Sequence, residues 1–200
     1  MNQFTCSIII PTFNRASFSK QISENIRSQS YPFIMEILVG DDGSEQLDIV
    51  APYPIRYFTL PRMTIGAKRN FLVRHSKGDY VACMDTDDFY QPTFISKSIF
   101  NLIRTGKSVS GSADMIMAHE GKQYKVRCLY LDMLNEATLV FRRTFPGQFA
   151  DASAGEGHSF LSGHLEEIVE TDIESLMICH VHSGNTVDKS SWLQEKYLIK

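Results

Sequence analysis

The stretch GDYVACMDTDD, residues 78–88, decides the fold of this chain. Its apolar run at positions 80–84 leads directly into three acids, Asp85, Asp87 and Asp88. Carboxylates at the end of a buried strand repel one another and lose hydration, so they are costly unless a cation or hydrogen-bond donors compensate them. The pattern therefore indicates either a ligand site at a strand end or a solvated turn before a helix.

The composition is that of an ordinary globular domain, and 200 residues are enough for one domain with its own core. The net charge of −3 argues against nucleic acid as a partner. No apolar run approaches the ~20 residues that span a bilayer, so we expect no transmembrane segment. The opening MNQFTC lacks the features of a signal peptide, and we expect a cytoplasmic protein, free or peripheral to a membrane.

The cysteines lie far apart and form no CxxC pair. This spacing favours reduced side chains that pack as small apolar groups over a structural zinc site. The four residues are Cys6, Cys83, Cys128 and Cys179.

The first half alternates between the periods of strands and helices, as a βαβ chain does. The pattern predicts strands at residues 6–10, 35–40, 55–60 and 79–84. It predicts helices that begin at a Ser17 cap, at Gly66 and at Pro92. The first strand is apolar on both faces, which predicts a central strand covered on both sides.

The second half is less regular. Its pattern predicts a hairpin over residues 113–131 that turns at 120–122, and a strand over 137–145. A helix is expected after the glycines of residues 155–168, and a late strand within 174–186.

Three of the first four strands end in polar residues, PTFNR (11–15), GDDGS (40–44) and DTDD (85–88). The carboxyl ends of parallel strands share one edge of a sheet, where ligands bind. Two aspartates spaced by one residue can place oxygens on one divalent cation, with further oxygens from a nucleotide diphosphate. Lys68 and Arg69 open a predicted helix, a position that disfavours cations unless an anion lies nearby.

The segments CSIIIPTFNR (6–15), VGDDGS (39–44) and GAKRNFLVRHSKGDYVACMDTDD (66–88), in this order and at these spacings, resemble glycosyltransferase family 2. GEGHSFL (155–161) and HVHSGNT (180–186) are similar to the acceptor-side and C-terminal histidine segments of that family. The resemblance extends over most of residues 4–187.

This resemblance implies the GT-A fold, an α/β architecture. In this fold a Rossmann-like, mostly parallel central sheet is flanked by helices and accompanied by a smaller antiparallel portion on the acceptor side. It implies a single domain, in which about residues 1–105 bind the nucleotide and about residues 106–200 bind the acceptor. The implied reaction is a metal-dependent, inverting transfer of a sugar from a nucleotide-sugar donor, usually with UDP. The acceptor would be a hydroxyl of a glycan, a lipid-linked molecule or another compound.

The family pattern also implies roles for individual residues. Asp87 would bind Mn²⁺ or Mg²⁺ directly. Asp85 matches the family residue that lies near the ribose and the metal, and His182 matches the histidine that approaches the metal or the diphosphate. A structural role for His182 is the alternative. Asp88 either joins this group or caps the next helix. The donor-binding positions that the resemblance implies are Thr12, Phe13, Arg15, Asp41, Asp42, Lys68, Arg69, Asn70, Asp85 and Thr86.

Three of these positions carry more specific expectations. Asp41 matches the family position that accepts a hydrogen bond from the base, whereas Asp42 either contributes to the site or only shapes the turn. Phe13 would lie along the nucleobase, with packing in the core as the alternative.

The general base is less clear. An inverting transfer needs a carboxylate near the acceptor hydroxyl. The family often has GED where this chain has GEG, residues 155–157. Glu156 is the expected base and Asp151 the alternative. Trp192 either covers an acceptor sugar or packs in the core.

Two other functions fit parts of the pattern. A nucleotidyltransferase also pairs an α/β sheet with metal-binding aspartates, but PTFNR contains none of the glycines of a phosphate-binding loop. A nucleotide-sugar or glycan-binding module without catalysis is the third class, because the aspartate of GED is missing.

Overall fold

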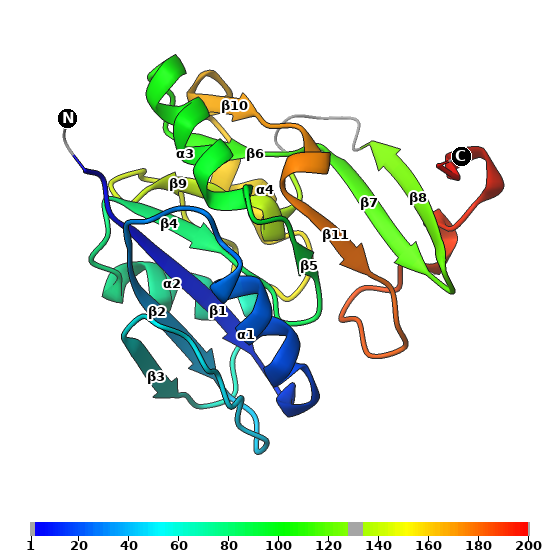
Figure 1. The fold of residues 1–200 in the computed structure, drawn as a ribbon, viewed down its shortest axis with the longest axis horizontal. Coiled ribbons are helices and arrows are strands. Elements are labelled where there is room, and N and C mark those ends of the chain that lie inside the picture. Colours follow the sequence, from blue (N-terminus) through cyan, green and yellow to red (C-terminus); the bar gives the residue numbers. More distant parts are fainter. Residues whose placement is uncertain (1–2, 128–133, 200) are drawn as a thin grey trace.

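The computed structural model describes residues 3–127 and 134–199 and has a central sheet, helices on both faces and a smaller second sheet (Figure 1). The strands of the central sheet are, in spatial order, β10 (Ile168–Glu170), β6 (Val109–Gly111), β9 (Val140–Arg142), β4 (Tyr80–Cys83), β1 (Cys6–Thr12), β2 (Ile34–Asp41) and β3 (Ile55–Thr59). β9 is antiparallel to both of its neighbours, and the other pairs are parallel. The sheet is therefore mostly parallel, as predicted.

Helices cover both faces of this sheet. α1 (Ser19–Arg27) and α3 (Phe94–Thr105) share a core with Ile8 and Ile10 of β1. α2 (Ile65–His75) and α4 (Gly157–Leu161) share the opposite core with Ile9. Successive residues of a strand point to opposite faces, so an unbroken apolar run fits a strand covered on both sides. The prediction of a central strand at residues 6–10 is confirmed.

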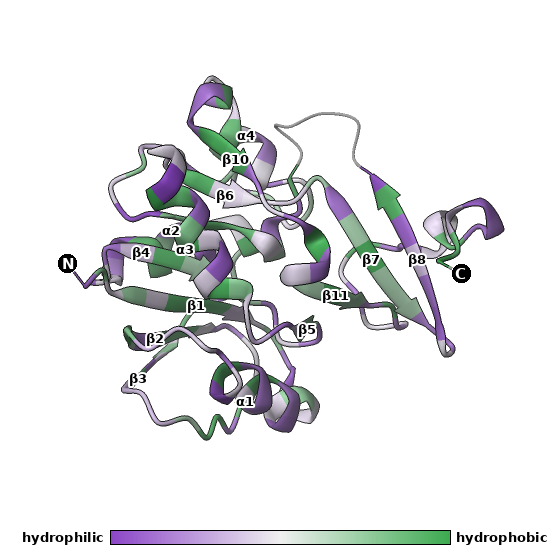
Figure 2. Cartoon of the chain, turned by 45° about the horizontal axis from the view of Figure 1, so that its top comes forward, coloured by the Kyte–Doolittle hydropathy of each residue, from purple (hydrophilic) through white to green (hydrophobic). Residues whose placement is uncertain are grey.

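The second sheet has the order β5 (Phe89–Tyr90), β11 (Met177–His180), β7 (Asp114–His119) and β8 (Lys122–Arg127). β7 and β8 form the predicted hairpin, and the turn residues Glu120 and Gly121 both have positive φ, which suits a tight turn between twisted strands. The end of the predicted hairpin, with Cys128, lies outside the described residues. Figure 2 shows β11 as a hydrophobic strand and β8 as a largely hydrophilic one.

Two predicted helix features are wrong. Ser17 caps no helix, because it lies within a 3₁₀ turn, Ala16–Phe18, that precedes α1. The helix expected in residues 155–168 is only the five-residue α4. Gly163 follows at a φ of 78°, and the chain then forms a 3₁₀ turn and β10.

Other features of the described part concern the cysteines and the membrane. Cys6, Cys83 and Cys179 are buried free thiols. None of the helices in residues 3–127 and 134–199 is long and apolar enough to cross a bilayer.

A loop that follows β9 packs directly on the first turn of α2. The Gly66 amide donates to Ala152 O at 3.0 Å, and the Ala150 amide donates to Glu156 O at 3.0 Å. A Cβ on Gly66 would lie 1.8 Å from Ala150 O, so only glycine allows this approach. The contact fixes residues 150–156, and with them Glu156, against α2.

We therefore expect Gly66→Ala to destabilise the fold, because either α2 or the loop must move to admit the methyl group. The loss in the free energy of unfolding should be about 3 kcal/mol, at the upper end for an overpacked site. Urea unfolding measures it.

Gly155→Ala is the matched control in the same loop. A Cβ there meets nothing within 4 Å, and the cost is only that of a left-handed backbone at a φ of 64°, about 1 kcal/mol. Equal losses in the two variants would contradict the packing argument.

Candidate active site

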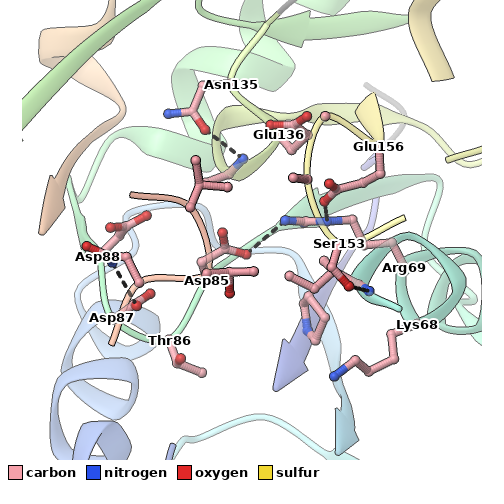
Figure 3. Close-up of a pocket in the computed structure, with 18 of the residues that line it drawn as sticks. Lys68, Arg69, Asp85, Thr86, Asp87, Asp88, Asn135, Glu136, Ser153 and Glu156 are labelled. Atoms are coloured by element: carbon pink, nitrogen blue, oxygen red, sulfur yellow. Dashed lines mark hydrogen bonds and ion pairs between the residues drawn. The ribbon is translucent and has the colours of Figure 1, made fainter. Parts of the chain in front are cut away.

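A cavity of about 430 Å³ opens at the carboxyl ends of β1 and β4. Its walls also include the start of α2, residues 134–137, residues 153–156 and part of the C-terminal segment. Figure 3 shows Asp85, Arg69 and Glu156 in succession across it. The expected site residues that line it are Thr12, Phe13, Arg15, Lys68, Arg69, Asp85, Thr86, Asp87 and Glu156.

Arg69 crosses the floor of this cavity as a buried cation. Its Nη2 lies 3.0 Å from Asp85 Oδ1, and its Nε lies 3.2 Å from Glu156 Oε1. Burial opposes the charge, yet Asp85 and, more weakly, Glu156 raise the pKa of Arg69 above its ordinary value. Its Nη1 is buried and has no hydrogen-bond partner in the described part of the chain. These acids are the anions that a cation at the start of a helix requires.

Lys68, the neighbouring cation, points to a different partner. Its Nζ lies 2.5 Å from Asp42 Oδ1 and donates to Thr12 O at 2.8 Å. Asp42 also accepts the Met63 amide at 2.9 Å. Burial acts to raise the pKa of Asp42, but the bonds from Lys68 and Met63 hold it below its ordinary value. Lys68 thus joins the ends of β1 and β2 to α2, and Asp42 does more than shape a turn.

Asp41 and Asn70 brace the walls of the cavity. The two carboxylate oxygens of Asp41 accept the Gly43 amide, at 2.9 Å, and the Tyr57 hydroxyl. The Asn70 side chain binds both the carbonyl and the amide of Phe149, at 2.8 and 3.0 Å. Neither residue, nor Asp42, lines the cavity.

Asp87 gathers polar groups from distant segments. Its Oδ2 lies 2.9 Å from His182 Nε2, 3.4 Å from Asn185 Nδ2 and 3.6 Å from Arg15 Nη1. His182 Nδ1 accepts the Gly184 amide at 3.1 Å. The neutral ring therefore carries its proton on Nε2 and donates to Asp87.

Asp88 does not cap a helix, and that alternative is wrong. Its Oδ1 accepts the His180 amide at 2.9 Å, whereas α3 begins after Thr93 without a side-chain cap. Asp88 is buried, and this burial together with the charge of Asp87 raises its pKa to about 7.

Two aromatic side chains line the cavity and are partly exposed. Phe13 is 40% exposed, and the Arg62 guanidinium carbon lies 3.6 Å from the centre of its ring. Trp192 is 37% exposed. Packing in the core, the alternative considered for both residues, is wrong. Beside Phe13, the buried Thr12 Oγ1 has no hydrogen-bond partner among residues 3–127 and 134–199.

The two acids considered as the base lie in different places. Asp151 is exposed, accepts the Thr64 hydroxyl at 2.5 Å and does not line the cavity. Glu156 is buried and lines it. A third acid, Glu136, also lines the cavity and accepts the Gly157 amide at 3.1 Å. Sequence analysis missed Glu136, although a lone acid in the run LNEATLVF, residues 134–141, is a detectable signal.

Comparisons with known proteins agree with this architecture. The family model described as "Glycosyl transferase family 2" matches residues 7–164. An uncharacterized glycosyltransferase of Rickettsia bellii is 32% identical over 148 residues, which are 68% of this chain and 21% of that protein.

Two solved structures have a similar fold. S. aureus TarS 1-349, in complex with UDP-GlcNAc, superposes with a TM-score of 0.66 at 15% identity, over 90% of this chain and 60% of that one. The mannosyltransferase PcManGT from Pyrobaculum calidifontis, in complex with GDP-Man and Mn²⁺, has a TM-score of 0.62 at 13% identity, over 96% of this chain and 59% of that one.

The chain thus spans about a fifth of the R. bellii relative and three fifths of the TarS structure. The family match covers well over half of the 200 residues, and the architecture is that of the GT-A fold. The chain belongs to glycosyl transferase family 2.

Proposed function

We propose that this chain is the catalytic domain of an inverting glycosyltransferase that transfers a sugar from a nucleotide-sugar donor, with UDP as the nucleotide, to an acceptor hydroxyl. One observation carries the proposal. A single cavity is lined by the exposed Phe13 ring at the end of β1, by the cations Arg15 and Arg69, and by Asp87, which pairs with His182 outside the lining. A nucleotide diphosphate needs both, a surface for its base and a cationic environment for its phosphates. The UDP-GlcNAc bound by TarS is consistent with this choice of donor.

The nucleoside would lie on Phe13. The ring is exposed, with Arg62 stacked on it, and base stacking on such a side chain is favourable. Thr12 Oγ1, which lacks a partner among the described residues, is available to the base or ribose. Thr86 and Asp85 also line the cavity.

The Asp87–His182 pair fits a divalent cation. A carboxylate oxygen and an imidazole nitrogen are both suitable ligands for Mn²⁺, the ion bound in PcManGT. No group of three or more His, Cys, Asp or Glu residues that could hold a metal occurs among the described residues, so diphosphate oxygens and water would supply the other ligands. His182 would offer Nε2 to such a cation in the tautomer with the proton on Nδ1, in which the Gly184 amide would no longer donate to the ring.

The cationic residues of the cavity would favour the departing diphosphate. When bound, the metal acts as a Lewis acid toward this leaving group. Arg15 lies beside Asp87, and Arg69 keeps one buried nitrogen without a partner in the described part. Both guanidiniums can therefore stabilise negative charge that develops on the phosphate oxygens.

The acceptor would enter from the opposite wall. Glu136, Glu156 and Trp192 line the cavity, and all three come from the second half of the chain. We accordingly assign donor binding to about residues 1–105 and acceptor binding to about residues 106–200. The acceptor is a glycan, a lipid-linked molecule or another compound that offers a hydroxyl.

A donor screen tests the proposal as a whole. The protein is incubated with Mn²⁺ and labelled nucleotide sugars, and release of the free nucleoside diphosphate is followed. Release of UDP from one sugar donor is the expected result. Pyrophosphate chemistry would indicate a nucleotidyltransferase, and binding without turnover would indicate a binding module.

Phe13→Ala should weaken UDP binding by about 1–3 kcal/mol, because the base loses its stacking surface. Calorimetry with UDP measures the change. Phe100→Ala is the matched control, since Phe100 is 60% exposed on α3 and does not line the cavity. An equal loss of affinity for inorganic pyrophosphate would place Phe13 away from the base.

Asp87→Asn should remove the increase in UDP affinity that Mn²⁺ produces, because the variant keeps the shape but loses the charge that holds the cation. Binding of UDP is compared by calorimetry with and without Mn²⁺. Asp48→Asn, which changes an exposed acid outside the cavity, serves as the control. An unchanged metal dependence in the Asp87 variant would refute the assignment.

A further inference from the structure

Glu136 lines the cavity and contacts Gly157, although the two are 21 positions apart in the sequence. The Gly157 amide donates to Glu136 Oε1 at 3.1 Å. A Cβ built on Gly157 would lie 2.6 Å from Glu136 Cγ and 2.9 Å from Oε1. The Glu136 side chain therefore fills the space that any side chain at position 157 would enter.

The backbone that carries Glu136 is firmly held. Glu136 opens the 3₁₀ turn Glu136–Thr138, which leads into β9. Asn135 caps this turn by accepting the Ala137 amide at 3.1 Å, and the buried Tyr90 hydroxyl donates to Ala137 O at 3.1 Å. The carboxylate consequently has a defined position at the cavity wall, a requirement for a group that must meet a reacting atom.

Glu156, another acid that lines the cavity, is held in an ion pair. Its Oε1 lies 3.2 Å from the Nε of Arg69, and both side chains are buried. Glu156 therefore serves as an anion that the buried Arg69 requires, with Oε1 already accepting a hydrogen bond from the guanidinium.

Glu136 lies within the electrostatic influence of the same arginine but is not paired with it. No ion pair among the described residues includes Glu136, and burial followed by the charge of Glu156 raises its pKa above the ordinary value. A carboxylate with a raised pKa accepts a proton more readily than an ordinary one.

We propose that Glu136 is the general base of the transfer, acting from the place beside Gly157 at the acceptor wall. The inference rests on the proposed function. The Glu136 carboxylate takes the proton of the acceptor hydroxyl, and the acceptor oxygen forms a bond to the anomeric carbon of the donor sugar. The bond from that carbon to the diphosphate oxygen breaks, and its electron pair leaves with the diphosphate. Glu136 afterwards releases the proton to water.

Glu136→Gln tests the assignment directly. The variant keeps size and the contact with the Gly157 amide but cannot take the proton. Release of UDP from the donor that the parent protein uses best should fall by about 10²–10⁴-fold, while UDP affinity with Mn²⁺ stays at the parent value. A variant that turns over at the parent rate would overturn the proposal.

The second test moves the carboxylate from position 136 to position 157. Glu136→Ala opens the space beside position 157, and adding Gly157→Asp places a carboxylate there from the neighbouring segment. We expect the double variant to recover at least about tenfold of the rate lost in Glu136→Ala, within the range of general base catalysis. Glu136→Ala with Gly157→Asn is the matched control, equal in shape but unable to act as a base, and it should recover nothing.

The outcomes separate this proposal from the proposed function. Equal recovery by Asp and Asn at position 157 would show that Glu136 only fills space, which overturns the proposal. A parental rate in Glu136→Gln together with a large loss in Glu156→Gln would assign the base to Glu156. If the parent protein neither binds UDP nor releases it from any nucleotide sugar, the proposed function itself fails.

Discussion

The buried guanidinium of Arg69 is the interaction on which the site depends. It joins Asp85, at the exit of β4, to Glu156, in the loop beyond β9, across a helix that begins between them. A buried cation is tolerated only with anions beside it, and removing one partner of such a pair costs about 3–5 kcal/mol. Arg69 therefore fixes the distance between the strand end and the loop that carries Glu156. Lys68, the preceding residue, likewise connects α2 to Asp42 and to the end of β1.

The polar residues around the cavity fall into two groups, those that bind only protein partners and those that line the cavity. Asp41 and Asn70 form hydrogen bonds with other residues of the protein and do not line the cavity, so they support its walls. Phe13, Asp87 and Glu136 line the cavity. A single hydrogen bond to a ligand contributes about 0.5–1.5 kcal/mol, which is less than the cost of removing one partner from a buried ion pair. The ion pairs of Arg69 and Lys68 therefore stay intact when a ligand binds.

Much of this architecture could be predicted from the sequence. The unbroken apolar run of β1 predicted a central strand, and the acids after β4 predicted the cavity edge. The three-residue strands β6 and β10 are too short to show a period, so they were missed. Asp88 resembled a helix cap because its partner, the His180 amide, is 92 positions away. Contacts across such separations are set by tertiary packing, which local pattern does not contain.

In the GEG segment, residues 155–157, the place of an expected acid in the sequence is taken in space by an acid from another segment. Along the chain, glycine at 157 where an acid is common looks like the loss of a catalytic group. In three dimensions the same place holds the carboxylate of Glu136, and the glycine is what leaves room for it. Proton transfer constrains where an oxygen lies, and it is indifferent to which segment supplies that oxygen. A glutamate from the turn before β9 can occupy this place only because residue 157 carries no side chain, which makes the two positions dependent on each other.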